Sequence, residues 1–252
     1  MLFSTEQRVF LGSMFGEYMK TGGIPEYVRT GNKEYLRSLY ESIIYRDIIV
    51  RNRLPSERMI KELVKFTASN VGKEISFNSL KNMLGAGSAT TVKEYFGYLE
   101  DSYIAFLLPR FDPSLKKQVY AGKKAYFIDC ALANTVGFRP AEDRGRMLEN
   151  AVFIELKRRG KEIYYYKGKR ECDFLLREGI KITEAVQVSE SLSGSSKERE
   201  IEGLLEALKA YGLKRGLILT RDESEEIERE GLKIRIMPVW EWMLGNETYP
   251  SD

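Results

Sequence analysis

Apolar residues recur every three or four positions near the start of the chain, which is the spacing of amphipathic helices. Between residues 4 and 50 this pattern predicts two or three helices. The run Gly22-Gly23-Ile24-Pro25 interrupts the pattern, because glycine and proline break a helix, and a second apolar series extends from about 32 to 50. Residues 1–54 are therefore expected to form a helical segment.

Residues 55–126 are expected to form three helices followed by two short strands. Ser56 and Ser88 stand where a serine side chain caps the first turn of a helix. The strands are expected at 103–108 and 124–128, with a basic turn between them. Helices followed by a hairpin indicate a helix-turn-helix domain with a wing, a winged helix.

The remaining segment, 127–252, alternates between helical spacing and short apolar runs typical of strands. A helix, three strands, a helix and a strand follow in the order of the nuclease-fold core. The predicted fold class is α/β (α+β overall), with a restriction-endonuclease-like mixed sheet in this segment. We expect helices at about 144–159 and 199–211, strands at 162–166, 172–176, 182–188, 216–220 and 232–237, a short acidic helix at 224–229 and a last helix at 239–244.

The amino-acid composition limits which kinds of catalysis and which partners the chain can have. The chain has 252 residues, 43% of them hydrophobic and 31% charged, which fits a globular protein of one or two domains. Its net charge of +3 is too small to imply nucleic acid by itself. The absence of histidine excludes Ser-His-Asp and Cys-His catalysis. Cys130 and Cys172 lack a partner spacing and lie in apolar runs, so we expect buried free thiols, a reducing compartment and a cytoplasmic location. No apolar run reaches membrane-spanning length, so no membrane partner is expected.

The most informative chemistry lies on two neighbouring predicted strands. PD-(D/E)xK nucleases place a carboxylate on one strand and Glu-x-Lys on the next, and together these hold Mg²⁺ and a catalytic lysine. Here Asp173 stands on the first strand, and Gln187 and Ser189 occupy the positions of the Glu and the Lys. Strand side chains alternate between faces, so Glu184 lies on the opposite face from Gln187 unless a bulge changes the register.

Glu149 completes the degenerate catalytic set. It lies on a predicted helix with Val152, Phe153 and Leu156 on its apolar face, so its carboxylate is expected to be partly buried. A buried carboxylate needs a cation or hydrogen-bond donors. Mg²⁺ held by Asp173 and Glu149 would supply one. The alternative is a bond to Arg170, Lys167 or a backbone amide.

The substitutions weigh against nuclease activity. The amide oxygen of Gln187 carries no net charge, whereas Mg²⁺ prefers anionic oxygens. Ser189 cannot supply the ammonium that would offset charge on the reacting phosphate, a loss of about 10²–10³ in rate. A lysine elsewhere, such as Lys181 or Lys197, could compensate.

Basic residues of the predicted winged helix are the candidates for binding nucleic acid. Four belong to or flank the wing, and one lies on the would-be recognition helix beside Glu94, Glu100 and Asp101, whose charge is wrong for phosphate. The alternative is a winged helix that packs against protein. The five candidates are Lys93, Lys116, Lys117, Lys123 and Lys124.

The chain resembles the C-terminal part of prokaryotic, mostly archaeal, AAA-type ATPases, in which a winged helix precedes a degenerate restriction-endonuclease-like domain of unknown function. The resemblance rests on a series of short motifs in a fixed order. They are Gly22-Gly23-Ile24-Pro25-Glu26, Tyr45-Arg46-Asp47-Ile48, Thr91-Val92-Lys93-Glu94-Tyr95, Leu99-Glu100-Asp101-Ser102-Tyr103, Lys124-Ala125-Tyr126-Phe127-Ile128-Asp129, Leu148-Glu149-Asn150, Glu171-Cys172-Asp173-Phe174, Val186-Gln187-Val188 and Arg199-Glu200-Ile201.

The resemblance implies a nucleic-acid-binding module with an inactive nuclease-like domain, the tail of an ATPase-like protein. The alternatives are an active Mg²⁺-dependent nuclease with a rearranged site and a protein-interaction module that does not touch DNA. The ATPase motif Gly-x-x-x-x-Gly-Lys-Ser/Thr is absent from this sequence, so ATP hydrolysis is not expected. DNA is the expected partner, with a protein or a second copy of the chain as the alternatives. No cofactor is expected, with Mg²⁺ at the degenerate site as the alternative.

Overall fold

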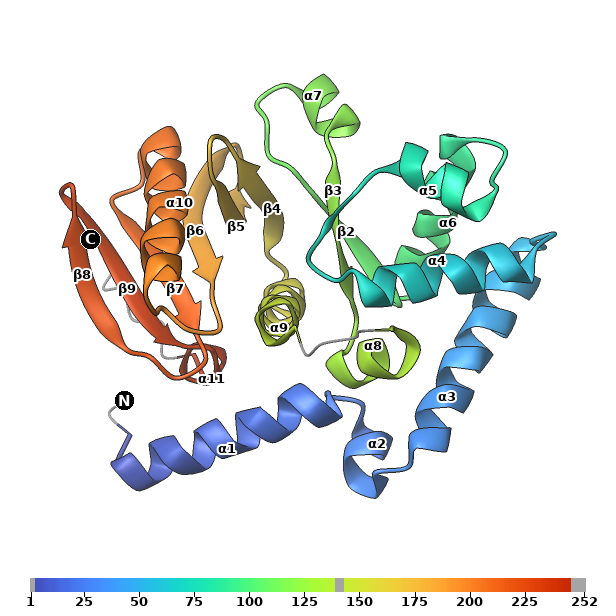
Figure 1. Cartoon of the computed structure of the whole chain (residues 1–252), viewed down its shortest axis with the longest axis horizontal. Coiled ribbons are helices and arrows are strands. Elements are labelled where there is room, and N and C mark those ends of the chain that lie inside the picture. The colour runs from blue at the N-terminus through green and yellow to red at the C-terminus, as the bar shows by residue number, and fades with distance from the viewer. Residues whose placement is uncertain (1–2, 139–142, 246–252) are drawn as a thin grey trace. The chain divides into compact units, whose positions relative to one another are not determined.

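The structure is a computed structural model that describes residues 3–138 and 143–245 (Figure 1). It is of the mixed α/β class, as the sequence predicts. The chain divides into two compact units. The helical unit comprises Tyr18–Pro109 and Ser114–Ile154, and the sheet unit comprises Met1–Glu17, Arg110–Pro113 and Glu155–Asp252. The predicted boundaries at 54/55 and 126/127 both fall inside the helical unit and stay predictions.

Two helices run from one unit into the other. Helix α1 (Thr5–Thr21) begins in the sheet unit, and helix α9 (Arg144–Arg158) begins in the helical unit. Among the described residues, no helix is both long and apolar enough to cross a membrane.

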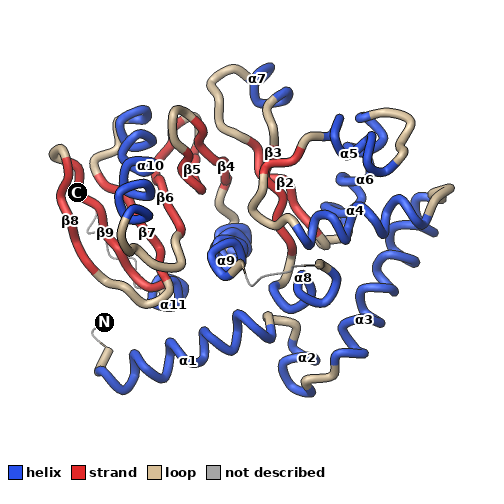
Figure 2. Tube along the Cα trace, in the orientation of Figure 1, coloured by secondary structure: helices blue, strands red, loops and turns tan. Residues whose placement is uncertain are grey.

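The helical unit consists mainly of helices, with short strands among them (Figure 2). A π-helical stretch, η1, continues directly from α3. The elements are α2 (Pro25–Thr30), α3 (Lys33–Ser42), η1 (Ile43–Val50), α4 (Glu57–Ser69), β1 (Glu74–Ile75), α5 (Phe77–Leu84), α6 (Ala89–Asp101), β2 (Ala105–Pro109), α7 (Leu115–Tyr120), β3 (Lys123–Phe127) and α8 (Cys130–Val136).

The predicted serine caps are confirmed. The Ser56 hydroxyl accepts a hydrogen bond from the backbone of Met59 at the start of α4. The Ser88 hydroxyl accepts one from Thr91 at the start of α6. Each side chain satisfies a backbone N–H that has no partner within its own helix, which is why these helices begin where the sequence predicts.

The strands of the helical unit form an antiparallel sheet in the order β1-β3-β2. The hairpin β2–β3 was predicted, whereas β1 and the short helix α7 between the two strands were not. Strand β1 is only two residues long, too short for any periodicity to mark it.

The sheet unit is built on a mixed sheet in the order β4-β5-β6-β7-β9-β8. Strands β4, β5 and β6 run antiparallel in sequence, and β7 and β9 then continue parallel to β6. The elements are β4 (Glu162–Lys167), β5 (Glu171–Glu178), β6 (Lys181–Val188), α10 (Ser195–Tyr211), β7 (Arg215–Thr220), β8 (Glu225–Arg229), β9 (Leu232–Pro238) and α11 (Val239–Met243).

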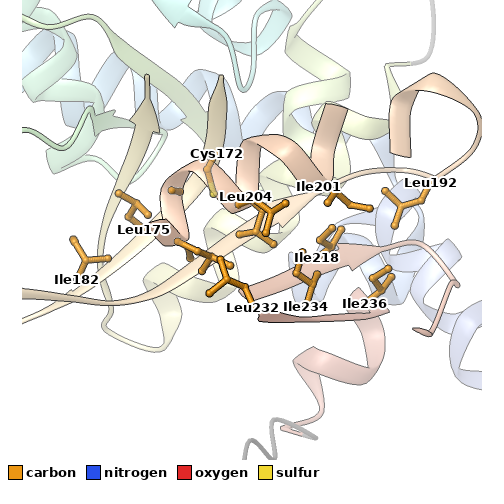
Figure 3. Close-up of a cluster of buried hydrophobic side chains, with 14 of the residues drawn as sticks. Cys172, Leu175, Ile182, Leu192, Ile201, Leu204, Ile218, Leu232, Ile234 and Ile236 are labelled. Atoms are coloured by element: carbon orange, nitrogen blue, oxygen red, sulfur yellow. The ribbon is translucent and has the colours of Figure 1, made fainter. Parts of the chain in front are cut away.

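Helix α10 covers one face of this sheet, and the core of the unit lies between them (Figure 3). Leu204 and Leu208 of α10 are fully buried against side chains from the strands, among them Leu175 and Ile218. Cys172 joins the same cluster. Both cysteines are buried and free, as the sequence predicts.

The predicted acidic helix at 224–229 is wrong, because these residues form strand β8. Strand β8 pairs antiparallel with β9 at the edge of the sheet, and Glu230 and Gly231 connect the two strands. Both connecting residues have positive φ, 54° and 74°, as a two-residue hairpin turn requires. The acidic composition resembles a solvated helix, but charged side chains also protect an edge strand from pairing with another chain.

Strict alternation along β5 is also wrong. The register between β4 and β5 shifts between Tyr164 and Tyr166. As a result, Cys172 and Leu175 contribute to one hydrophobic cluster. They are three positions apart, so strict alternation would place them on opposite faces. The shift lies next to Asp173, where it changes which way the following side chains point.

Candidate functional site

Asp173 and Gln187 lie on neighbouring strands and contact each other. The register pairs Phe174 of β5 with Val186 of β6, and the next position brings Asp173 beside Gln187. The backbone N–H of Asp173 donates to Oε1 of Gln187 at 3.2 Å. Both residues are buried, with 6% and 5% of their surfaces exposed.

The remaining polar atoms of this pair are also engaged. Oδ2 of Asp173 accepts a hydrogen bond from the backbone N–H of Val188 at 3.0 Å. Nε2 of Gln187 donates to Oε2 of Glu200 at 2.6 Å. The Gln187 amide therefore connects β5 to α10, with its oxygen on one partner and its nitrogen on the other.

Glu200 is a member of this cluster that the sequence analysis did not assign. It lies in the second turn of α10 and, four residues before Leu204, close to the helix's buried face. One signal in the sequence could have identified Glu200. It is an acid at the edge of an apolar helical stripe, on the helix that directly follows β6. The signal is weak, because acids at such positions are also common in surface ion pairs.

Arg199 supplies the positive charge of the site. Its Nη2 lies 2.7 Å from Oε1 of Glu200. The hydrogen bond and charge of Glu200 raise the pKa of the Arg199 guanidinium, and the charge of Asp173 adds to the effect. The Asp173 backbone N–H, the Gln187 amide, the Glu200 carboxylate and the Arg199 guanidinium thus form a chain of hydrogen bonds that ends on α10.

The positions of the missing lysine and its substitutes lie apart from this network. The Ser189 hydroxyl donates to the backbone oxygen of Ser191 at 2.9 Å. Lys197 pairs with Glu225 of β8 at 2.7 Å, and Glu184 pairs with Lys161 at 3.3 Å. Lys181 is exposed at the first position of β6. The cation of α10 that is coupled to the charge of Asp173 is the guanidinium of Arg199.

Glu149 makes its bonds inside the helical unit. Its Oε1 lies 2.9 Å from Nζ of Lys124 and accepts a hydrogen bond from the Tyr126 hydroxyl at 2.6 Å. Both Lys124 and Glu149 are buried. Gly72 leaves room for the carboxylate, because a Cβ there would lie 2.9 Å from Oε2 of Glu149. The basic side chain on this carboxylate is Lys124, whereas the sequence analysis considered Arg170 and Lys167.

No group of three or more cysteine, aspartate or glutamate side chains in the described part of the chain is placed to hold a metal ion. The arrangement that comes closest to such a group contains only two acids, Asp173 and Glu200. The Gln187 amide is hydrogen-bonded to both residues. An amide oxygen can bind Mg²⁺, but here it accepts from the Asp173 backbone.

The five candidate lysines differ in exposure. Lys93 is exposed on α6, and Lys116 and Lys117 are exposed on α7. Lys123 is half-buried at the start of β3, where burial and the charge of Lys93 lower its pKa. Lys124 is no longer a candidate for binding nucleic acid. Only 2% of its surface is exposed and its ammonium pairs with Glu149, so it cannot reach a phosphate.

The acidic residues on α6 also differ. Glu100 is partly buried, and its Oε1 accepts a hydrogen bond from the backbone of Leu107 in β2 at 3.0 Å, so it holds the hairpin. Glu94 and Asp101 are exposed. The exposed surface of this helix is therefore more acidic than basic.

The segment between β2 and α7 belongs to the sheet unit. The guanidinium of Arg110 donates to the backbone oxygen of Lys167, and the backbone N–H of Phe111 donates to that of Tyr165 at 2.9 Å. The Phe111 ring packs edge-on against Tyr164 and Tyr211, with centroid distances of 5.2 and 5.3 Å. Residues 110–113 are thus fixed on strand β4.

Two family models match the chain. Residues 13–142, about half of it, match the domain of unknown function DUF8612, and the chain belongs to this family. Residues 144–242 match the domain of unknown function DUF4143. The second match begins where helix α9 begins.

The chain is also similar to two longer proteins. It is 32% identical over 261 residues to the uncharacterized protein MJ1544 of Methanocaldococcus jannaschii. The aligned region covers 96% of this chain and 58% of the relative. It is 26% identical over 246 residues to an uncharacterized protein of Haemophilus influenzae, which covers 94% of this chain and 60% of the relative. The chain therefore spans about three fifths of the length of these relatives. No solved structure matches.

Proposed function

We propose that this chain is a nucleic-acid-binding module whose nuclease-like sheet does not cut nucleic acid. The observation that carries the second half is the polar network of Asp173, Gln187 and Glu200, in which the amide occupies the place of a metal-binding acid. The observation that supports the first half is the set of accessible lysines on α6 and α7 and at the start of β3, namely Lys93, Lys116, Lys117 and Lys123.

The sheet unit supports a nuclease-like origin. The order α9, β4, β5, β6, α10, β7, with an antiparallel meander followed by a parallel strand, is the order of the nuclease-fold core. Asp173 and Gln187 occupy neighbouring strands, as the acid and the Glu-x-Lys do in those enzymes.

The same network opposes catalysis. A metal ion at Asp173 would need anionic oxygens around it, and Gln187 supplies none. Ser189 contributes a hydroxyl bonded to a loop carbonyl, where an active enzyme needs a cation beside the reacting phosphate. Each of these losses costs about 10²–10³ in rate, so the two together predict negligible turnover.

The helical unit supports a winged helix. Helices α4, α5 and α6 are followed by the hairpin β2–β3, and β1 adds to the edge of that hairpin. Serine and glycine residues set the helix ends, so the arrangement follows directly from the sequence.

Lys93 and Lys123 support an anion-binding surface on this unit. Burial and then the charge of Lys93 lower the pKa of Lys123, against the opposing effect of Glu100, so the two ammonium groups repel each other. A phosphate between them would remove this repulsion. Lys116 and Lys117 would add to the long-range electrostatic attraction of the nucleic acid.

Fluorescence anisotropy with a labelled DNA oligonucleotide tests binding. The double variant Lys93→Ala/Lys123→Ala should weaken binding of every sequence and lower the salt slope by about 1.8, at ~0.9 per phosphate contact. The matched control is Lys33→Ala/Lys65→Ala, which removes the same charge from exposed positions on α3 and α4. Equal affinity of both variants and wild type would instead favour the protein-interaction module.

A cleavage assay tests the other half. Wild type incubated with Mg²⁺ and single- or double-stranded DNA should leave the substrate intact. Mg²⁺-dependent cutting that Asp173→Ala abolishes would establish the active-nuclease alternative in its place.

We also propose that the chain acts as the tail of a longer AAA-type, ATPase-like protein. The family resemblance of its motifs and the greater length of its relatives support this. The chain itself has no Gly-x-x-x-x-Gly-Lys-Ser/Thr motif, so calorimetry should detect no ATP binding.

A further inference from the structure

Helix α7 presents a surface that none of the packing of its unit explains. Leu115, Val119 and Tyr120 have 73%, 49% and 82% of their surfaces exposed. Lys116 and Lys117 are exposed between them. Large apolar and aromatic side chains in water are costly unless a partner covers them, and the two lysines are complementary to a partner of negative charge.

We propose that α7 binds single-stranded nucleic acid, with a base stacked on Tyr120 and the neighbouring phosphates on Lys116 and Lys117. This rests on the proposed function and specifies its ligand. Proteins that bind single strands combine a basic track with exposed aromatic rings, because every base offers a flat face for stacking. A base inside a duplex is already stacked and cannot reach the ring.

Two further observations disfavour a duplex. A recognition helix reads the major groove with its exposed side chains, and α6 exposes Glu94 and Asp101 there against the single cation of Lys93. These carboxylates repel the closely spaced phosphates of a duplex more strongly than those of one flexible strand.

The wing gives the second observation. In a winged helix that contacts a duplex, the loop between the hairpin strands is free to follow the DNA. Here Arg110 and Phe111 are bonded to β4, and the Phe111 ring packs between Tyr164 and Tyr211. The first part of this loop cannot leave strand β4 without breaking those contacts, which leaves the exposed face of α7 as its accessible part.

The test compares a labelled single strand of twenty thymidines with a mixed-sequence single strand and with its duplex, by anisotropy at several salt concentrations. Wild type should bind both single strands more tightly than the duplex. Tyr120→Ala should weaken single-strand binding about tenfold, the loss of one stacked base, and leave duplex binding unchanged. Tyr120→Phe, which keeps the ring, should bind like wild type.

Two control variants separate stacking from charge. Lys116→Ala/Lys117→Ala should weaken single- and double-stranded binding alike and reduce the salt dependence. Tyr45→Ala removes another exposed ring, 57% exposed on η1, and should change nothing. Tyr120 lies at the surface, so its replacement should leave the thermal unfolding midpoint unchanged.

The outcomes are distinguishable. A duplex bound more tightly than either single strand, or a Tyr120→Ala variant that binds single strands like wild type, overturns this inference while the proposed function stands. Failure of wild type to bind any of the three oligonucleotides overturns both.

Discussion

Glu149 and Asp173 have the same predicted role but lie in different environments. Glu149 is satisfied by a buried ammonium and a phenol from β3, all within the helical unit. The Asp173 carboxylate, in the sheet unit, accepts a hydrogen bond from the backbone N–H of Val188, and its charge also acts on the guanidinium of Arg199. Sequence alone gives the two residues equal standing as acids in apolar surroundings.

The difference shows that the nearest cation, rather than burial, decides what a carboxylate can do. A carboxylate locked to a buried lysine is a structural element, because removing either charge leaves the other unpaired. A carboxylate held by amides keeps an electrostatic environment that a change in one neighbour can alter. The two regions should therefore respond differently to mutation.

The largest expected effect is at Lys124. Replacement by alanine leaves Glu149 buried without its cation and should reduce the free energy of unfolding by about 3–5 kcal/mol. Urea unfolding followed by circular dichroism measures this. Lys61→Ala, which breaks the exposed pair with Glu57, is the control and should cost less than about 1 kcal/mol. Similar losses for the two variants would show that the Lys124–Glu149 pair is not structural.

The next effect is at Gln187. Gln187→Glu would place a third carboxylate beside Asp173 and Glu200, and like charges at this distance should cost about 1–3 kcal/mol without a metal. Mg²⁺ should restore the thermal midpoint of this variant and leave that of wild type unchanged. The double variant Gln187→Glu/Ser189→Lys tests whether cleavage follows, although a site without its supporting residues is often too loose to react.

A variant that gains no Mg²⁺ response would contradict the placement of the three acids around one point. Asp173→Asn in the Gln187→Glu background is the matched control, because it removes one of the proposed metal ligands while keeping the side chain's size. The response to Mg²⁺ should be lost.

Glu200 should have a smaller effect. Glu200→Ala removes the acceptor of the buried Gln187 amide, which should cost about 1–2 kcal/mol. Lys197→Ala on the same helix, which breaks only the surface pair with Glu225, should cost less than about 1 kcal/mol. Equal costs would mean that the Gln187 amide finds water in place of Glu200.

Local sequence accounts for most of the fold. Ser56, Ser88 and Gly85 begin or end their helices through contacts within a few residues, so the signal is complete in the sequence. The prediction for strand β8 was wrong because its charged residues fit a solvated helix equally well. Its pairing with β9 depends on the short Glu230-Gly231 turn.

The candidate site was predictable only in part. Asp173 and Gln187 were found because neighbouring strands in a meander bring such positions together. The partners of the acids were not found, because Lys124 is 25 positions from Glu149 and Glu200 is 13 from Gln187. Contacts at these separations depend on how helices pack on sheets, for which residue spacing gives no rule.

The smallest expected effect is at Glu206, which fixes the turn that precedes Asp173. Its carboxylate accepts hydrogen bonds from the Tyr166 hydroxyl at 3.0 Å and from the backbone N–H groups of Lys169 and Arg170 at 2.8 and 3.0 Å. Burial would raise the pKa of Glu206, but these hydrogen bonds outweigh burial and lower it. Glu206→Gln should cost less than about 1 kcal/mol at neutral pH, since the group is partly exposed to solvent.

The pH dependence gives this prediction its sign. A carboxyl whose pKa is lowered on folding stabilises the protein above its unfolded pKa of about 4.3, and this stabilisation is lost as the pH falls through the folded pKa. Wild type and Glu206→Gln should therefore differ in thermal midpoint at pH 7 and converge below about pH 4. A constant difference across that range would mean that the glutamine acts by distorting the turn, not by removing a charged acceptor, and the turn before Asp173 would then depend on shape rather than on charge.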